Sequence, residues 1–158
     1  MTSPAPASQA TSGAPTPAAG PNAEGSARWE ANVATLRRML WCISNGDPEG
    51  QLAHIADDIV YEAPYYATME PRRGKAAMAG MLRAVQDRFE TILYEVVAVH
   101  PTVDPDHVIA EVRGDHQVLG ADRRYQNHYV MFLRYRDGLV VHWREFSNPL
   151  VYATATGE

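Results

Sequence analysis

The chain has 158 residues, of which 46% are hydrophobic and 21% charged, and its formal net charge is -5. This length suits one domain, because single hydrophobic cores are typically built from about 100 to 150 residues. The 14 Lys and Arg residues are scattered among 19 acidic residues, whereas phosphate-binding surfaces rely on clustered cations. We therefore expect a single domain that does not bind nucleic acid.

The sequence contains no recognisable targeting or membrane signal. No stretch approaches the roughly 20 apolar residues that cross a bilayer, and the N-terminus lacks the basic start and apolar region of a secretory signal. We expect a cytoplasmic protein without a membrane partner.

The N-terminal third changes character near residue 27. Residues 1–26 are almost wholly Ala, Pro, Ser, Thr and Gly, which cannot bury enough surface to offset the entropy of ordering, so we expect a disordered tail. From Arg28 onward, apolar residues recur at spacings of three and four, which predicts a helix ending at Asn45-Gly46. Those apolar positions are Trp29, Val33, Leu36, Leu40 and Ile43. A short second helix follows from Pro48 to about His54.

The next segment mixes a strand, a loop and a third helix. Residues 59–62 predict a short strand closed by Pro64, and residues 65–73 predict a loop rich in Tyr, Met and Pro. Residues 74–89 predict a helix. Its apolar side carries Met78, Met81, Leu82 and Val85.

The remainder predicts consecutive strands, with a strong hairpin signal at Asp137-Gly138. The expected strands are 91–100, 108–117, 124–136 and 139–147. This order indicates an α+β fold in which three N-terminal helices pack on a curved, mostly antiparallel sheet that encloses a conical pocket. We expect the domain to span residues 27–152, with a flexible C-terminal tail at 153–158.

Alternation along the strands sorts side chains into faces. On the last strand Trp143, Glu145 and Ser147 share one face. On the 108–117 strand, Glu111, Arg113 and Asp115 lie opposite Val108, Ala110 and Val112, a split that is typical of a solvent face. On the long strand, Tyr125, Asn127 and Tyr129 form a set that suits either a ligand cavity or an ordinary core edge.

Motifs for metal, nucleotide or serine-hydrolase chemistry are missing. The six histidines show no metal-ligand spacing and the single cysteine does not accompany them. There is no glycine-rich phosphate loop and no Gly-x-Ser-x-Gly turn. We therefore expect neither a metal nor a cofactor.

Three motifs carry a family resemblance. Tyr-Gln-Asn-His-Tyr at 125–129, the turn at 137–138 and Trp-Arg-Glu-Phe-Ser-Asn-Pro at 143–149 resemble the SnoaL-like branch of the nuclear transport factor 2-like superfamily, and particularly its phenazine-biosynthesis A/B proteins. The resemblance covers about residues 28–152. It implies that Glu145 is an acid/base glutamate facing the cavity, while Met81 stands where those relatives carry a helix histidine.

A second resemblance concerns limonene-epoxide-hydrolase-like members, which use a carboxylate-Arg-carboxylate relay. Arg113-Gly114-Asp115 and Trp143-Arg144-Glu145 are similar to the two halves of that relay, so the polar face of the 108–117 strand becomes the cavity face. Tyr61 matches a tyrosine that places water in that family, but its asparagine partner is replaced by Ala63.

Together these resemblances imply a site built on Glu145 as base or acid. Asp115 is its expected partner and Arg113 the bridge, because an Arg between two carboxylates can separate their pKa values. The expected donors to a developing oxyanion are Tyr61, Asn127 and Tyr129. The expected apolar walls are Tyr65, Tyr66, Met69, Met81, Val85, Tyr94 and Trp143.

The resulting hypothesis is a cofactor-free acid/base enzyme of natural-product biosynthesis. We expect a homodimer that cyclises, isomerises or dehydrates an apolar, polycyclic or polyketide-like small molecule. Two alternatives stay open: an epoxide hydrolase or epoxide-opening cyclase, and a non-catalytic small-molecule-binding or scaffold protein.

Overall fold

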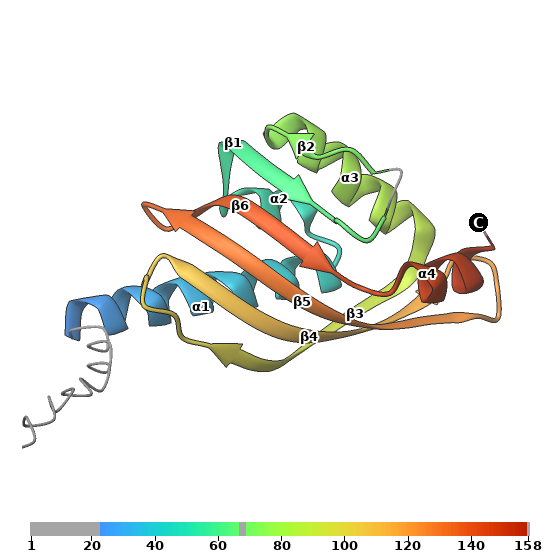
Figure 1. The fold of residues 1–158 in the computed structure, drawn as a ribbon. Coiled ribbons are helices and arrows are strands. Elements are labelled where there is room, and N and C mark those ends of the chain that lie inside the picture. The colour runs from blue at the N-terminus through green and yellow to red at the C-terminus, as the bar shows by residue number, and fades with distance from the viewer. Residues whose placement is uncertain (1–22, 67–68, 158) are drawn as a thin grey trace, which may run out of the picture.

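The computed structural model describes residues 23–66 and 69–157, and the elements of this part of the chain are shown in Figure 1. Its helices are α1 (Ala23–Ser44), α2 (Pro48–Leu52), α3 (Lys75–Arg88) and α4 (Pro149–Thr156). Its strands are β1 (Ile55–Glu62), β2 (Arg72–Arg73), β3 (Phe89–His100), β4 (His107–Val118), β5 (Arg124–Arg136) and β6 (Leu139–Phe146). None of these helices is long and apolar enough to cross a membrane.

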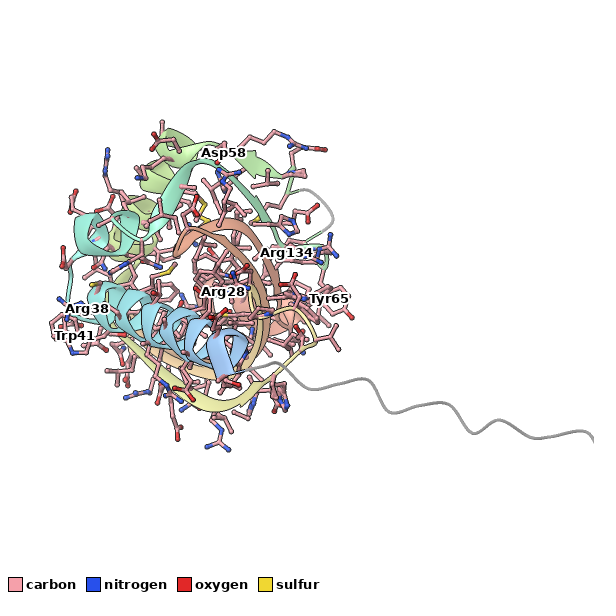
Figure 2. All side chains as sticks on the ribbon, turned by 90° about the vertical axis from the view of Figure 1, so that its left-hand side faces the viewer. Arg28, Arg38, Trp41, Asp58, Tyr65 and Arg134 are labelled. Carbon is pink, nitrogen blue, oxygen red and sulfur yellow. The ribbon has the colours of Figure 1, made fainter. Side chains whose placement is uncertain are left out.

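The strands form one sheet in the order β2-β1-β6-β5-β4-β3. Every neighbouring pair is antiparallel except β1 and β6, which are parallel. In Figure 2 the strands arc around the interior of the molecule, while α1 and α3 lie across the open side of the arc. The predicted α+β architecture with a curved, mostly antiparallel sheet is confirmed.

The hairpin between β5 and β6 fixes the register of the central strands. Asp137 and Gly138 both have positive φ, 53° and 76°, as a two-residue turn that follows the twist of the sheet requires. Leu133 then pairs with Trp143, and Met131 with Glu145. This register carries Glu145 to the inner face of the sheet.

Strand β4 shows the division between the two faces most clearly. Val108, Ala110, Val112 and His116 are buried on the inner face, whereas the intervening Glu111, Arg113 and Asp115 lie on the outer face. The inner residues of β5 are Tyr125, Asn127, Tyr129, Met131, Leu133 and Tyr135. The hydrophobic core therefore lies between this face and the helices.

The ends of the chain differ from the sequence-based expectation. Helix α1 begins at Ala23, inside the segment expected to be a disordered tail, while residues 1–22 lie outside the described residues. The expected flexible tail from residue 153 is helical as far as Thr156. Asn148 accepts a hydrogen bond from Leu150 at the start of α4, and Gly157 ends it with a φ of 80°.

Candidate active site

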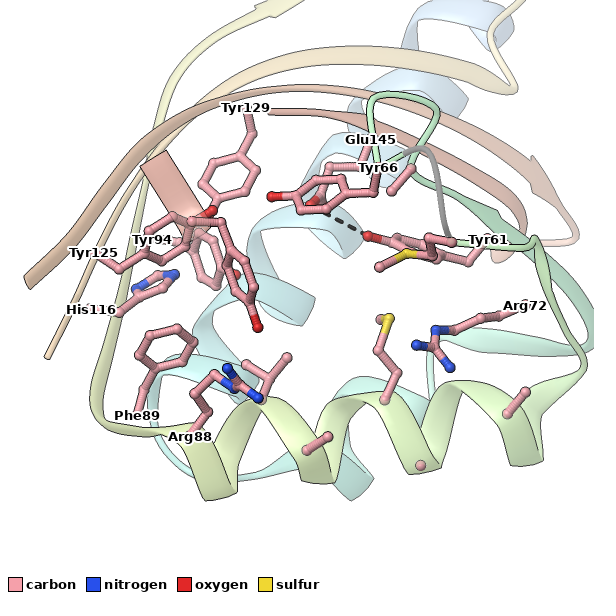
Figure 3. A pocket seen from close by; sticks show the side chains of 18 residues that line it. Tyr61, Tyr66, Arg72, Arg88, Phe89, Tyr94, His116, Tyr125, Tyr129 and Glu145 are labelled. Atoms are coloured by element: carbon pink, nitrogen blue, oxygen red, sulfur yellow. Dashed lines mark hydrogen bonds between the residues drawn. The ribbon is translucent and has the colours of Figure 1, made fainter. Parts of the chain in front are cut away.

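A cavity of about 550 Å³ lies between the inner face of the sheet and α3 (Figure 3). Its walls come from every strand, from α3 and from α4. The lining residues are Tyr61, Ala63, Tyr66, Met69, Arg72, Ala77, Gly80, Met81, Ala84, Val85, Arg88, Phe89, Tyr94, His116, Tyr125, Tyr129, Glu145 and Tyr152. This volume falls within the range of about 300 to 1,000 Å³ that small-molecule sites occupy.

Helix α3 presents one continuous face to the cavity. Its lining positions are 77, 80, 81, 84, 85 and 88, which are spaced by three and one, as residues on one helical face are. Three of them, Ala77, Gly80 and Ala84, are small and leave space for a ligand. The bulkier Met78 and Leu82 point instead into the core.

Among the described residues that line the cavity, Glu145 is the only one with a carboxylate side chain. The hydroxyl of Tyr61 donates a hydrogen bond of 3.4 Å to its Oε1 atom, and no cation forms an ion pair with it in the described part of the chain. Burial raises the pKa of Glu145 to about 7, outweighing the opposite effect of the Tyr61 hydrogen bond. A carboxyl with this pKa can accept or give a proton near neutrality.

Four buried tyrosines of the cavity remain protonated at neutral pH. Burial, with a smaller contribution from the charge of Glu145, raises the pKa of Tyr61 well above its ordinary value. Burial likewise raises the pKa values of Tyr94, Tyr125 and Tyr129. Their hydroxyl groups are therefore hydrogen-bond donors rather than bases.

A hydrogen-bonded chain behind the cavity centres on Tyr125. The Tyr129 hydroxyl donates to the Tyr125 hydroxyl oxygen at 3.0 Å, and the Asn127 amide donates to the same oxygen at 2.9 Å. Because this oxygen accepts two hydrogen bonds, its own proton is available to a further acceptor. Asn127 also bonds to both backbone groups of Asn148, which ties β5 to the start of α4.

His116 enters the cavity from β4, in phase with the buried residues of that strand. Its Nδ1 accepts a hydrogen bond of 3.3 Å from the Leu93 backbone N–H, while its buried Nε2 has no partner among the described residues. Burial lowers the pKa of His116 to about 4, so the ring is neutral and Nε2 carries the proton.

Gly114 makes space for two of these rings. A Cβ atom at this position would lie 2.7 Å from the Tyr129 ring, closer than side-chain contacts allow, and 3.1 Å from the His116 ring, which is tighter than most such contacts. The absence of a side chain at 114 therefore lets Tyr129 and His116 occupy their places in the wall.

The structure brings most of the predicted site residues together. Those that line the cavity are Glu145, Tyr61, Tyr66, Met69, Met81, Val85, Tyr94 and Tyr129. Trp143 lies buried behind the wall, where its ring meets that of Tyr61 edge-on with centroids 5.6 Å apart. Asn127 is buried too, and its amide is already engaged by Tyr125 and Asn148, so it does not offer a donor to a ligand.

The expected placement of Asp115 and Arg113 in the cavity is wrong. Both lie on the outer face of β4, because strand alternation places them opposite His116 and Val112. Asp115 pairs with Arg124 at 2.7 Å, and Arg113 lies 3.4 Å from Glu95. The carboxylate-Arg-carboxylate relay is therefore not assembled around Glu145.

The expected wall position of Tyr65 is also wrong. Its side chain is 62% exposed and packs edge-on against Phe146 at the outside of the molecule, as the label at the periphery of Figure 2 shows. The neighbouring Tyr66 turns inward instead, and its hydroxyl lies 3.2 Å from Ser147 Oγ.

Several cavity residues were not among the predicted site residues. They are the small residues Ala63, Ala77, Gly80 and Ala84 and the larger residues Arg72, Arg88, Phe89, His116, Tyr125 and Tyr152. Alternation on β4 could have identified His116, because it shares the face of Val108, Ala110 and Val112. Arg72 gave no local signal, since β2 has two residues and is defined by its pairing with β1.

No group of three or more His, Cys, Asp or Glu side chains in the described ranges is arranged to hold a metal ion. The chemistry that these residues offer is proton transfer by Glu145, within a wall of phenolic donors and apolar groups.

Comparisons with known proteins show relatives of the same fold. A PhzA/B-like protein of Pseudomonas aeruginosa is 29% identical over 124 residues, which cover 77% of this chain and 87% of that protein. The crystal structure of a proposed isomerase from Bacillus subtilis superposes with a TM-score of 0.76 at 26% identity, covering 82% of this chain and 95% of that one.

A Mycobacterium tuberculosis epoxide hydrolase like the limonene enzyme shares the fold, with a TM-score of 0.66 at 20% identity over 80% of this chain and 90% of that one. The SnoaL-like domain family matches residues 36–143. The chain therefore belongs to the SnoaL-like family.

Proposed function

We propose that this protein is an acid/base enzyme in which Glu145 moves a proton within an apolar small molecule of specialised metabolism, in an isomerisation or cyclisation. One observation carries the proposal. Glu145 lies in an aromatic cavity with a hydrogen bond from Tyr61 and no cation paired with it among the described residues, and burial raises its pKa to about 7. General acid/base catalysis works best with a group of this pKa.

The ionised Glu145 would remove a proton from a carbon next to a carbonyl group of the substrate. The C–H electron pair then moves toward the carbonyl, and negative charge develops on its oxygen. Glu145 returns the proton to a different carbon in an isomerisation. In a cyclisation the carbanion forms a bond to a second carbonyl carbon of the same molecule, the π electrons of that carbonyl move to its oxygen, and this oxygen takes the proton from Glu145.

Protonated tyrosines would stabilise the oxyanion. Tyr125 is the best placed, because Asn127 and Tyr129 both donate to its oxygen and leave its proton for the cavity. Donors fixed in advance toward a developing charge contribute strongly to catalysis in a site of low polarity. Asn127, which was expected to donate to the oxyanion itself, would instead act through its hydrogen bond to Tyr125.

The epoxide-hydrolase alternative loses its structural support here. That reading required Asp115 and Arg113 to share the cavity with Glu145, and both face outward instead.

Proton abstraction can be measured without knowing the natural substrate. Cyclic β,γ-unsaturated ketones and 1,3-dicarbonyl compounds, with and without carboxylate groups, would be incubated in D2O. Deuterium incorporation would be followed by NMR, and conjugation by ultraviolet absorbance. We expect exchange with the wild-type protein and a loss of about 10²- to 10⁴-fold in Glu145→Gln. The rate should rise with pH through about 7, because the carboxylate is the base.

Glu111→Gln is the matched control, since Glu111 lies on the outer face of β4 and pairs with His100 at 2.7 Å. It should exchange deuterium at the wild-type rate. Binding of these compounds without any exchange would contradict the proposal and favour a non-catalytic binding protein.

A further inference from the structure

We infer that the substrate carries a carboxylate group, and that Arg72 binds it beside Tyr61 at the β2 side of the cavity. This inference rests on the proposed function for the reaction that follows binding, but it concerns a separate contact with its own measurement. It begins from a charged side chain that the acid/base proposal does not use.

Backbone pairing between β1 and β2 places Arg72 beside Tyr61, the residue that donates a hydrogen bond to Glu145. In the antiparallel register of β1 and β2, Arg72 lies directly opposite Tyr61, whose hydroxyl holds Glu145. Directly opposed residues have Cβ atoms about 4.5 to 5.5 Å apart and project to the same side of the sheet. Figure 3 shows the Arg72 guanidinium reaching into the cavity between Tyr61 and α3.

The guanidinium has no counter-charge in the described part of the protein. Its Nε atom is buried and lacks a hydrogen-bond partner, and no ion pair involves it. Two carboxylates of the neighbouring strand β1 pair with other cations, since Asp57 lies 3.3 Å from Lys75 and Asp58 lies 2.7 Å from Arg136.

Glu145 does not neutralise Arg72 either. An arginine close enough to pair with this carboxylate would lower its pKa, whereas the pKa of Glu145 is raised to about 7 and its causes include no arginine. Among the described residues, Glu145 therefore does not neutralise the charge of Arg72.

Burial of part of a cation without a partner is costly, so an anionic ligand group that pairs with the partly buried Arg72 side chain gains affinity. The planar fork of arginine matches a carboxylate with two parallel hydrogen bonds. Because the remaining wall is mostly aromatic and aliphatic, the cavity suits an apolar, ring-containing molecule that bears one such group.

The position of Arg72 also constrains which carbon reacts. A carboxylate anchored beside Tyr61 brings the adjoining part of the molecule toward Glu145, on the other side of the same tyrosine. The substrate class is thus an aromatic or polycyclic carboxylic acid with an acidic C–H near its carboxylate.

Calorimetric titration can test this contact in the absence of turnover. Three pairs of probes would be compared: benzoate with benzamide, 2-naphthoate with 2-naphthamide, and anthracene-2-carboxylate with its amide. We expect at least one carboxylate to bind wild-type protein about tenfold or more tightly than its amide, and Arg72→Gln to abolish that preference. Binding of the carboxylate should weaken as salt is added.

Arg73→Gln is the matched control, because Arg73 is the other residue of β2 and is exposed. It should keep the carboxylate preference. Arg72→Lys should keep part of it, since the charge remains but the fork is lost. Thermal unfolding of each variant would show that the fold is retained.

Three results would overturn the inference: no carboxylate preference in any probe pair, an unchanged preference in Arg72→Gln, or an equal loss in Arg73→Gln. Tighter binding of 2-naphthyl phosphate than of 2-naphthoate, lost in Arg72→Gln, would overturn the carboxylate assignment in favour of a phosphate ester. Glu145→Gln should retain carboxylate binding, so a failure of the acid/base proposal appears in the deuterium assay and leaves this titration unaffected.

Discussion

Glu145 and Asp115 are carboxylates on central strands of one sheet, yet they lie on opposite faces and differ in proton affinity. On the outer face, Arg124 at 2.7 Å and Gln126 at 3.1 Å hold the pKa of Asp115 below its ordinary value. On the inner face, burial raises the pKa of Glu145 to about 7. The face of the strand, rather than the residue type, therefore decides which acid is suited to exchange protons at neutral pH.

The same division extends across the sheet. Outer carboxylates pair with cations, as Glu62 does with Arg144 at 2.9 Å, and the same Glu62 oxygen hydrogen-bonds with His142 Nε2 at 2.8 Å. The inner face is instead lined by tyrosines that serve as neutral donors. The outer face of the sheet therefore carries solvated ion pairs, whereas the inner face provides a site in which one buried carboxyl group can transfer a proton.

Activity gives the largest expected contrast between the two carboxylates. In the deuterium-exchange assay, Glu145→Gln should lose about 10²- to 10⁴-fold, because the proton carrier is removed. Asp115→Asn should change the rate by less than about threefold, as surface substitutions usually alter free energies by no more than about 0.5 kcal/mol. Comparable losses in both variants would show that Asp115 takes part in the chemistry.

The pH dependence of stability should show the next largest effect. Between pH values of about 4.5 and 7 the unfolded chain releases the Glu145 proton while the folded protein keeps it, so the free energy of unfolding falls as the pH rises. This contribution amounts to about 3 kcal/mol and levels off above pH 7. Glu145→Gln lacks it and should become progressively more stable than the wild type over this range.

Urea unfolding of both proteins at pH values from 4 to 8 would measure this difference. His116, whose pKa is lowered to about 4, makes a contribution of opposite sign in the wild type and in the variant alike. Subtracting one stability curve from the other removes it. A difference that does not change with pH would contradict the buried environment of Glu145.

Substitution of Gly114 tests how closely the inner face is packed. Gly114→Ala should destabilise the protein by about 1 to 3 kcal/mol, because the new Cβ would lie 2.7 Å from the Tyr129 ring. Gly80→Ala is the matched control: it lies within α3 with nothing within 4 Å of its Cβ position, and it should stabilise by about 0.5 to 1 kcal/mol. Chemical denaturation followed by circular dichroism would rank the two variants, and equal effects would mean that position 114 is not crowded.

The outer ion pairs should give the smallest effect. Glu62→Gln removes the partner of His142 and Arg144, and the free energy of unfolding should fall by less than about 1 kcal/mol at neutral pH, with a smaller loss at high salt. Because the pKa of Glu62 is lowered, the wild-type advantage should vanish as the pH falls through that pKa. A loss of several kcal/mol in urea unfolding would contradict the view of this face as solvated.

Local sequence predicted most of the sheet but less of the site. The strand at 124–136 and the turn at Asp137-Gly138 follow from alternation and from turn chemistry, and the structure has both at the predicted residues. Two-residue alternation on β4 likewise separated Arg113 and Asp115 from the buried set. The wrong placement of Arg113 and Asp115 in the cavity came from a motif match. Such a match compares spacings along the chain and does not determine which face of the strand a residue occupies.

Other parts of the site depend on pairing between distant segments. Arg72 enters the cavity because β2 pairs with β1, and the Tyr125 hydroxyl becomes a donor because two other side chains donate to its oxygen. Neither relation has a local sequence signal. The place of Glu145 in the cavity, in contrast, was predicted from the family resemblance, because alternation on the last strand does not distinguish its two mixed faces, and its catalytic role stays a prediction.

The central claim is that Glu145 exchanges its proton near neutral pH, and its pKa can be measured directly. Carbon-13 NMR of protein with labelled glutamate side chains, titrated from pH 4 to 9 and assigned with Glu145→Gln, would follow this carboxyl. We expect a midpoint near 7, as burial in the aromatic cavity requires. A midpoint near 4.5, the ordinary value, would contradict the account.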